Sequence, residues 1–287
     1  MRFTKMHGAA NDYVYVDVAA EPLEESLLAR LTVALADRHT GVGSDGLVLI
    51  CPSQRADFRM RMLNACDGSE AEMCGNAIRC VGKYAHDHGL TDKLDLTIET
   101  LGGLKYLKLF PGADGSIERV RVDMGAPVFD PQLIPVAAER PFDLTAEADG
   151  KTWTLHCAST GNPHAVTYVD DPMALDLPRI GPLLENHTLF PRRANIEFAR
   201  VMDRSHIQMR VWERGSGETM ACGTGACATA VVSMARGLVD DRVDVALRGG
   251  TLTIEWPSLQ GSVFMTGPAV EVFTGEIDID ALLGGTL

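Results

Sequence analysis

The sequence predicts an α/β protein made of two homologous domains whose sheets are mostly antiparallel. Two observations lead to this prediction. First, a strand, a turn, a Cys-Gly step and a helix occur twice in the same order along the 287 residues, and internal repetition indicates duplicated structural units. Second, the strand-like runs are mostly consecutive and joined by glycine-rich turns such as 111–115. That arrangement is more typical of antiparallel sheets than of a doubly wound parallel sheet.

The repeated unit begins with a short strand of alternating side chains and ends in an apolar helix. Its matching segments are 60–64 with 209–213, Glu70 with Glu218, Cys74 with Cys222, and the helical stretches 78–86 with 226–236. Upstream, Asn11 precedes a strand over 13–16 and Asn162 precedes one over 165–169. Because four matches in one order are improbable by chance, we interpret the halves as homologous.

The other segments complete the two halves. We expect further strands at 47–51, 94–99, 105–110, 120–123, 243–247, 252–256 and 262–265, and a helix over about 24–38. A domain boundary is expected near Met124–Pro127, where a proline-containing stretch begins.

Composition excludes several classes of protein. The net charge of −13 argues against a nucleic-acid partner, because such partners require clustered Lys and Arg. No run of 18 apolar residues is present, so no membrane span is expected. The first residues lack the apolar core of a signal peptide, and we therefore expect a cytoplasmic protein.

The seven cysteines do not form a recognisable framework. Their number is odd and no CxxC pair occurs, so neither disulfides nor a metal site is expected. Five of the seven, all except Cys74 and Cys222, are expected to be buried apolar side chains. Cofactors are not expected either, because no lysine accompanies a glycine-rich phosphate loop. The segment Gly41–Gly46 is glycine-rich, but it precedes a strand and does not open a helix, so it is interpreted as a turn.

Cys74 and Cys222 are the candidate reactive groups. Each is predicted to begin a helix, where backbone N–H groups and the helix dipole favour an anion. Such a location lowers a thiol pKa to about 3.5–7.5 and also binds carboxylates. Two thiols on opposite faces of one carbon could remove a proton and return one, which inverts a stereocentre. The pattern therefore predicts acid–base chemistry by a cysteine pair.

Four motifs give the sequence a family resemblance. They are Met6-His7-Gly8 with Asn11-Asp12, the run Asp67–Asn76, Gly161–His164, and Glu213–Gly225. Over essentially its whole length the chain resembles diaminopimelate epimerase. The resemblance implies two pseudo-symmetric α/β domains, each a mostly antiparallel, barrel-like sheet around a central helix, with the active site in the cleft between them. Residues 1–123 with 266–287 would form the amino-terminal domain, and 124–265 the carboxy-terminal domain.

The same resemblance implies an activity. The family interconverts LL- and meso-diaminopimelate without a cofactor, on the route to lysine and cell-wall peptide, and is often a homodimer. By motif position, Cys74 and Cys222 match the acid–base pair, and His164 and Glu213 match residues that assist it. The matching substrate-binding residues are Asn11, Asn64, Gly75, Asn76, Asn162, Asn195, Glu213, Arg214, Gly223 and Thr224.

The sequence departs from the family pattern at Ala10 and Ala77, where the family usually has glycine, and at two predicted ligand contacts. Glycine occupies position 46, where the family often has glutamine, and Asn64 lies one residue further from Cys74 than usual. We expect Cys66 to be the extra residue, in a loosened turn.

Two other functions compete with this prediction. One is a racemase for another amino acid, such as histidine or proline, on a similar scaffold. The other is a non-enzymatic redox or metal-binding protein that uses the two thiols. Glu213 and Arg214 favour a substrate with a second zwitterionic end, because they offer an ammonium acceptor and a bidentate carboxylate partner.

Overall fold

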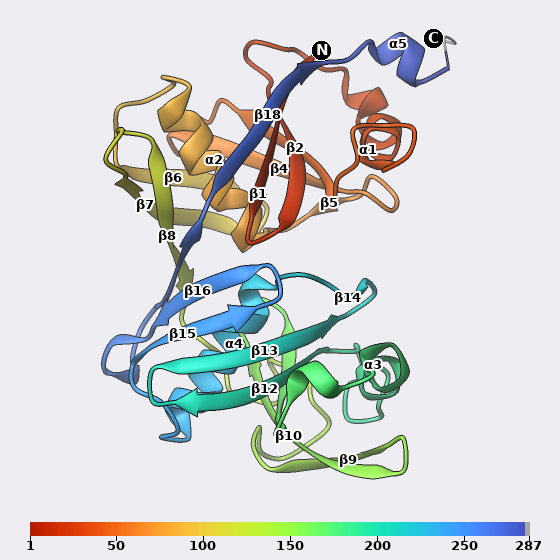
Figure 1. The fold of residues 1–287 in the computed structure, drawn as a ribbon, viewed down its shortest axis with the longest axis vertical. Coiled ribbons are helices and arrows are strands. Elements are labelled where there is room, and N and C mark those ends of the chain that lie inside the picture. The colour runs from red at the N-terminus through yellow and green to blue at the C-terminus, as the bar shows by residue number, and fades with distance from the viewer. Residues whose placement is uncertain (285–287) are drawn as a thin grey trace. The chain divides into compact units, whose positions relative to one another are not determined.

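A computed structural model describes residues 1–284, which divide into two compact units (Figure 1). The first unit contains residues 1–122 and 267–284, and the second contains 123–266. The chain therefore leaves the first unit once and returns to it near the carboxy terminus. No helix in the described part of the chain is long and apolar enough to cross a membrane.

The first unit is a sheet of eight principal strands. Neighbouring strands follow the order β18-β1-β2-β3-β4-β6-β7-β8, and the short β5 pairs with the end of β4. The β2–β3 and β4–β6 pairs are parallel, and the other five are antiparallel. Their bounds are β1 Arg2–Gly8, β2 Asn11–Asp17, β3 Gly46–Cys51, β4 Phe58–Asn64, β5 Glu70–Ala71, β6 Asp95–Thr100, β7 Gly103–Pro111, β8 Ile117–Gly125 and β18 Val270–Glu276.

The second unit repeats this topology strand for strand. Its order is β9-β10-β11-β12-β13-β15-β16-β17, with the short β14 paired to the end of β13. The third and fifth pairs, β11–β12 and β13–β15, are again the parallel ones. The bounds are β9 Leu144–Ala148, β10 Lys151–Ser159, β11 Pro163–Tyr168, β12 Asn195–Asp203, β13 His206–Glu213, β14 Gly217–Glu218, β15 Arg242–Leu247, β16 Gly250–Glu255 and β17 Val263–Pro268. The predicted duplication thus extends to the whole sheet.

Each sheet wraps around one helix. In the first unit α2, Gly75–Asp87, packs against β1, β2, β4 and β7; in the second α4, Gly223–Ala235, packs against six strands from β10 to β16. The usual requirement for a helix enclosed in this way is an apolar or small residue on every side, which α2 meets only in part because it buries Arg79. Helix α4 satisfies this requirement, because it consists largely of Ala, Gly, Val and Thr and is buried from Gly225 to Met234. The expected barrel-like sheet around a central helix is therefore present in both units.

The remaining helices lie outside the sheets. They are α1 Leu28–Ala36, α3 Leu177–Glu185, α5 Ile279–Leu282 and the 3₁₀ turns Glu25–Leu27, Pro172–Ala174 and Pro257–Leu259. Helix α3 was not expected from sequence, because Pro178 and Pro182 both fall within it. Pro178 stands in the first turn, where a missing N–H costs nothing.

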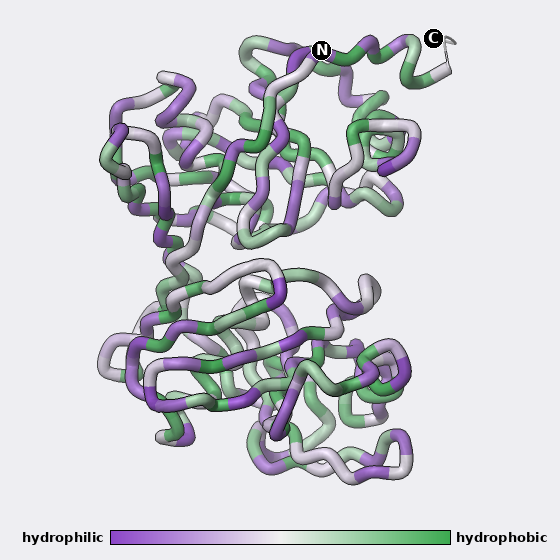
Figure 2. Tube along the Cα trace, in the orientation of Figure 1, coloured by the Kyte–Doolittle hydropathy of each residue, from purple (hydrophilic) through white to green (hydrophobic). Residues whose placement is uncertain are grey.

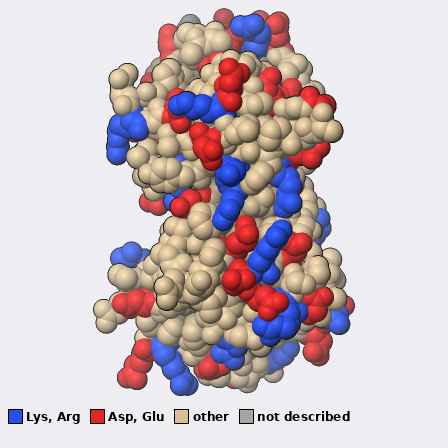
Figure 3. Space-filling view, turned by 90° about the vertical axis from the view of Figure 1, so that its left-hand side faces the viewer, with Lys and Arg blue, Asp and Glu red and all other residues tan. Residues whose placement is uncertain are grey.

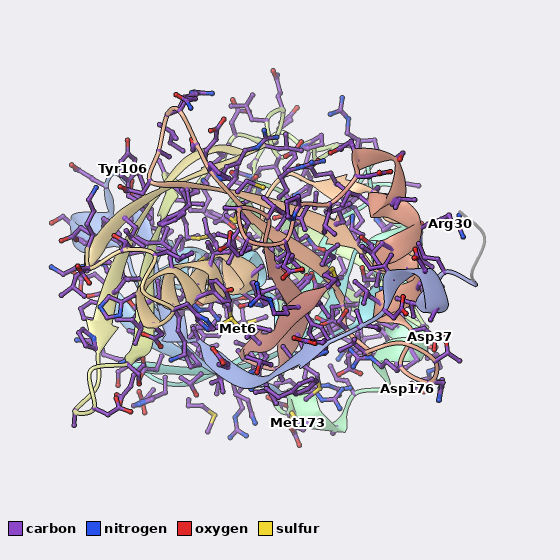
Figure 4. All side chains as sticks on the ribbon, turned by 90° about the horizontal axis from the view of Figure 1, so that it is seen from above. Met6, Arg30, Asp37, Tyr106, Met173 and Asp176 are labelled. Atoms are coloured by element: carbon purple, nitrogen blue, oxygen red, sulfur yellow. The ribbon has the colours of Figure 1, made fainter. Side chains whose placement is uncertain are left out.

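Side-chain alternation explains why the strands could be predicted. Along β13, buried Ile207, Met209 and Val211 alternate with more exposed residues, and the hydropathy colours alternate there in Figure 2. Viewed from above in Figure 4, Met6 of β1 lies among the interior side chains, whereas Tyr106 of β7 lies at the periphery. Their exposed fractions, 0% and 56%, agree with that view.

Candidate functional site

Cys74 is the N-cap residue of α2, as the sequence predicts. Its Sγ accepts a hydrogen bond from the Ala77 backbone N–H at 3.5 Å. The thiol in turn donates to Oδ1 of Asn11 at 3.5 Å, and the Tyr13 hydroxyl lies 3.9 Å from Sγ. Burial and the nearby Cys74 raise the pKa of Tyr13 well above its usual range, so Tyr13 stays a neutral hydrogen-bond donor.

A network behind Asn11 fixes the direction of its side chain. The Asn11 amide nitrogen donates to Asp45 at 2.7 Å, and Asp45 pairs with Arg38 at 3.0 Å. Asn76, itself 2% exposed, donates to Oδ1 of Asn11 at 3.2 Å. The Asn11 carbonyl oxygen therefore faces Cys74. Asp45 was not predicted, although it adjoins Gly46 in the glycine-rich turn.

Asn64 is less directly connected to this cluster. It ends β4, and its side chain donates to the Ser69 hydroxyl at 3.1 Å within the turn that contains exposed Cys66. The base of this turn is held by Arg61, which binds Glu70 at 2.7 Å. The second unit has the same support, because Arg210 binds Glu218 at 2.8 Å. The two glutamates that marked the repeat thus anchor equivalent turns.

Cys222 is the N-cap residue of α4. The Gly225 backbone N–H donates to its Sγ at 3.4 Å, and the Thr224 hydroxyl lies 3.5 Å away. Unlike Cys74, this residue is buried, at 5% exposed. Burial, together with the charges of Glu213 and Glu197, raises the pKa of the Cys222 thiol well above its usual range. The expectation that the helix start lowers this pKa is therefore wrong for Cys222, because desolvation outweighs the two hydrogen bonds.

His164 lies in a buried chain of polar side chains beside α4. Its Nδ1 is 2.7 Å from Oε1 of Glu197, and its Nε2 is 2.8 Å from Oδ1 of Asn162. His164 and Glu197 are both 0% exposed. Burial raises the pKa of Glu197, and the neighbouring His164 opposes that shift. Glu197 was not among the predicted site residues.

Asn195, Glu213 and Arg214 meet where β12 begins and β13 ends. The buried Asn195 donates to the Pro163 carbonyl at 3.0 Å and accepts from the Arg214 backbone N–H at 2.8 Å. Glu213 accepts a hydrogen bond from Thr219. The Arg214 guanidinium is exposed, and its hydrogen bond goes to the Arg192 carbonyl at 3.2 Å. Among residues 1–284 no carboxylate forms an ion pair with Arg214, so its charge is available to a ligand.

The first turns of the two central helices complete the predicted sites. Gly75 and Asn76 begin α2, and Gly223 and Thr224 begin α4. Backbone N–H groups at such positions can bind a carboxylate. Thr224 also accepts, through its carbonyl, a hydrogen bond from Thr160 at 3.0 Å. Each unit thus places a cysteine directly before the first turn of its central helix.

The unpredicted residues Tyr13 and Glu197 have different sequence signals. Tyr13 follows Asn11 by two residues, as His164 follows Asn162, so the repeat could have identified it. Glu197 has no such signal, because the residue in the corresponding strand register is the apolar Val48.

The cysteines outside the two helix starts only partly follow expectation. Cys80, Cys157 and Cys227 are buried, but Cys66 is exposed and Cys51 is half-buried, so the prediction of five buried thiols is wrong for these two. None of the seven is in a disulfide. Within the described residues no group of three or more His, Cys, Asp or Glu side chains is arranged to hold a metal ion.

On the face drawn in Figure 3, acidic and basic side chains are interspersed.

Comparison with known families gives a consistent result. The sequence model of the diaminopimelate epimerase family matches residues 3–129 and 156–272. A protein named diaminopimelate epimerase from Acetivibrio thermocellus is 53% identical over 98% of this chain and 100% of its own length. One of the same name from Agathobacter rectalis is 52% identical over 97% of this chain and 100% of its own.

Solved structures with lower identity share the fold. A Bacillus anthracis phenazine biosynthesis protein of the PhzF family superposes with a TM-score of 0.70 at 20% identity, covering 96% of this chain and 98% of its own. A probable proline racemase from Agrobacterium radiobacter K84 gives a TM-score of 0.68 at 14% identity, covering 100% and 96%. At these identities the likeness concerns the fold alone.

Proposed function

We propose, because this chain belongs to the diaminopimelate epimerase family, that it converts LL-diaminopimelate to meso-diaminopimelate without a cofactor. Family membership makes it an amino-acid epimerase and excludes the alternative of a non-enzymatic thiol protein. The proposed setting is the synthesis of lysine and peptidoglycan precursors in the cytoplasm. We also propose that the two domains expected from sequence each supply half of the site, and that the enzyme is a homodimer.

The proposed mechanism uses Cys74 and Cys222 on opposite faces of the α-carbon. The thiolate of one removes the α-proton, and the thiol of the other delivers a proton to the other face, so the configuration inverts. The observation that carries this proposal is the duplicated cysteine, placed in both units as the N-cap of a buried helix. Helix N–H groups aimed at the substrate carboxylate would stabilise the negative charge that develops when the α-proton leaves.

The two thiols are proposed to differ in protonation before substrate binds. Cys222 is buried near two carboxylates, which keeps it in the thiol form. It is therefore ready to donate a proton, while Cys74, hydrogen-bonded to Asn11, is more accessible. Acid–base pairs are commonly separated by such differences in environment.

The proposed binding residues divide between the two ends of the substrate. Gly75, Asn76, Gly223 and Thr224 would hold the reacting carboxylate through helix N–H groups, with Asn11 beside Cys74. Asn64, Asn162, Asn195, Glu213 and Arg214 would hold the distal zwitterion. His164 and Glu213 are proposed to assist the thiols.

Isotope exchange tests the proposed reaction directly. The reduced enzyme is incubated with LL-diaminopimelate in deuterated water, and product is analysed by chiral chromatography and mass spectrometry. We expect meso product that carries one solvent deuterium at the inverted α-carbon, because the incoming proton comes from a thiol that exchanges with solvent. Meso product without deuterium would contradict proton transfer through exchangeable groups, and no product would contradict the assigned substrate.

The protonation of Cys222 predicts how fast it reacts with iodoacetamide. Because its pKa is raised and only the thiolate is nucleophilic, alkylation at Cys222 should be slow at pH 7 and rise about tenfold per pH unit toward pH 9. Peptide mass spectrometry of timed samples gives the rate at each cysteine. Exposed Cys66 serves as the internal comparison. A Cys222 rate that is already maximal at pH 7 would contradict a thiol ground state.

A further inference from the structure

The buried pair of His164 and Glu197 is not required by the fold. The first unit has the same sheet topology, and there Tyr13 takes the place of His164 and Val48 the place of Glu197. Val48 and Glu197 are both 0% exposed. A carboxyl group buried where an apolar side chain also fits costs stability, and Oε2 of Glu197 has no hydrogen-bond partner among the described residues. The stability lost by burying the Glu197 carboxyl group indicates that Glu197 has a functional role in the second unit.

The contacts of His164 determine where its protons lie. Oδ1 of Asn162 only accepts hydrogen bonds, so Nε2 of His164 has to carry a proton to bind it at 2.8 Å. At Nδ1, one proton is shared with Glu197 across 2.7 Å, whether the pair is imidazolium with carboxylate or imidazole with carboxylic acid. In both states Nε2 is protonated. His164 is therefore a donor to Asn162.

The same chain of contacts orients Asn162. Since its Oδ1 is taken by the His164 proton, its amide nitrogen points elsewhere and remains a donor. Glu197 is also close to the start of α4: a Cβ on Gly225 would lie 2.8 Å from Oε1 of Glu197 and 3.3 Å from Sγ of Cys222. Because residue 225 has no side chain, the Glu197 carboxyl group and the Cys222 thiol can both lie close to its α-carbon.

We propose that Glu197 is a positioning residue that acts through His164 on Asn162. By keeping the proton on Nε2 of His164, it holds the oxygen of Asn162 inward and leaves the Asn162 amide nitrogen to donate to an oxygen of the substrate. This inference rests on the proposed function for the identity of the substrate. Under this proposal His164 affects the reaction by orienting Asn162, and it does not have to exchange a proton with Cys222.

A double-mutant cycle tests whether Glu197 acts through Asn162. We expect Glu197→Met to lower kcat/KM for LL-diaminopimelate about tenfold in the wild-type background, but less than about twofold in an Asn162→Ala background. Glu197→Gln, whose amide can donate to Nδ1 and preserve the proton on Nε2, should stay within about threefold of wild type. Thr229→Val, a change at another fully buried polar side chain of this unit, is the matched control and should leave kcat/KM unchanged. Equal losses from Glu197→Met in both backgrounds would overturn the proposal.

A substrate-free measurement keeps the inference separate from the proposed function. Nitrogen-15 NMR of the histidine rings, with His164 assigned by comparison with His164→Gln, reports which ring nitrogens carry protons. We expect Nε2 of His164 to be protonated at pH 7 in the unliganded enzyme. An unprotonated Nε2 would overturn the relay whatever the activity. Failure of the wild-type enzyme to epimerise diaminopimelate, with Nε2 protonated, would instead reject only the substrate assignment.

Discussion

Alanine at Cys74 or at Cys222 is expected to reduce kcat/KM for epimerisation of LL-diaminopimelate by about 10³-fold or more. Each thiol is proposed to handle the proton on one face of the α-carbon, so neither can replace the other. The rate is measured as formation of meso-diaminopimelate, and folding is checked by thermal unfolding. Serine at either position should be nearly as inactive, because a hydroxyl is a far weaker acid than a thiol and forms its anion much less readily.

Matched controls exist on the same two helices. Cys80 lies in α2 and Cys227 in α4, both fully buried beyond the helix start. Alanine at these positions removes a sulfur of the same chemistry away from the N-cap, and kcat/KM should stay within about threefold of wild type. Activity above a tenth of wild type in Cys74→Ala or Cys222→Ala would reject the two-base scheme.

The repeat explains why so much of the fold could be predicted from sequence. Apolar and polar side chains alternate along strands such as β4 and β13, and each of the two Cys-Gly sequences lies at the start of a helix. The local sequence pattern and the final structure therefore agree. The mostly antiparallel pairing follows from consecutive strands. The parallel pairs β2–β3 and β11–β12 could not be predicted in the same way, because they join strands separated by a helix or a long loop.

The site was less predictable than the fold, for a physical reason. The positions of Cys74 and Cys222 are fixed by local capping, which short motifs reveal. The protonation of Cys222 depends instead on burial and on the charges of Glu197 and Glu213, which come from other strands. Sequence reasoning accounted only for the helix start and so gave the wrong direction for that pKa. Asp45 was missed similarly, because its role is a hydrogen bond to the distant Asn11.

Leucine at Arg214 is expected to lower kcat/KM for diaminopimelate by about 10²–10³-fold, mainly through a higher KM. The guanidinium is exposed and forms no ion pair within the described residues, while its backbone N–H is held by Asn195 at 2.8 Å. A fixed backbone carrying an uncompensated guanidinium suits a bidentate bond to the distal carboxylate. Steady-state kinetics with LL-diaminopimelate measures the loss.

The effect of Arg214→Leu also distinguishes a diamino diacid substrate from an amino acid with a single carboxylate. Lysine at 214 keeps the charge but loses the planar fork, so Arg214→Lys should recover only part of the affinity. Arg200→Leu, which removes an exposed arginine further along β12, should have no effect and controls for net charge. If Arg214→Leu leaves both kcat and KM unchanged, the distal carboxylate does not bind there, and a racemase for an amino acid with a single carboxylate becomes the better assignment. If KM rises while thiol chemistry at Cys74 and Cys222 persists, the turn after β13, which contains Arg214, recognises the second zwitterionic end of the substrate.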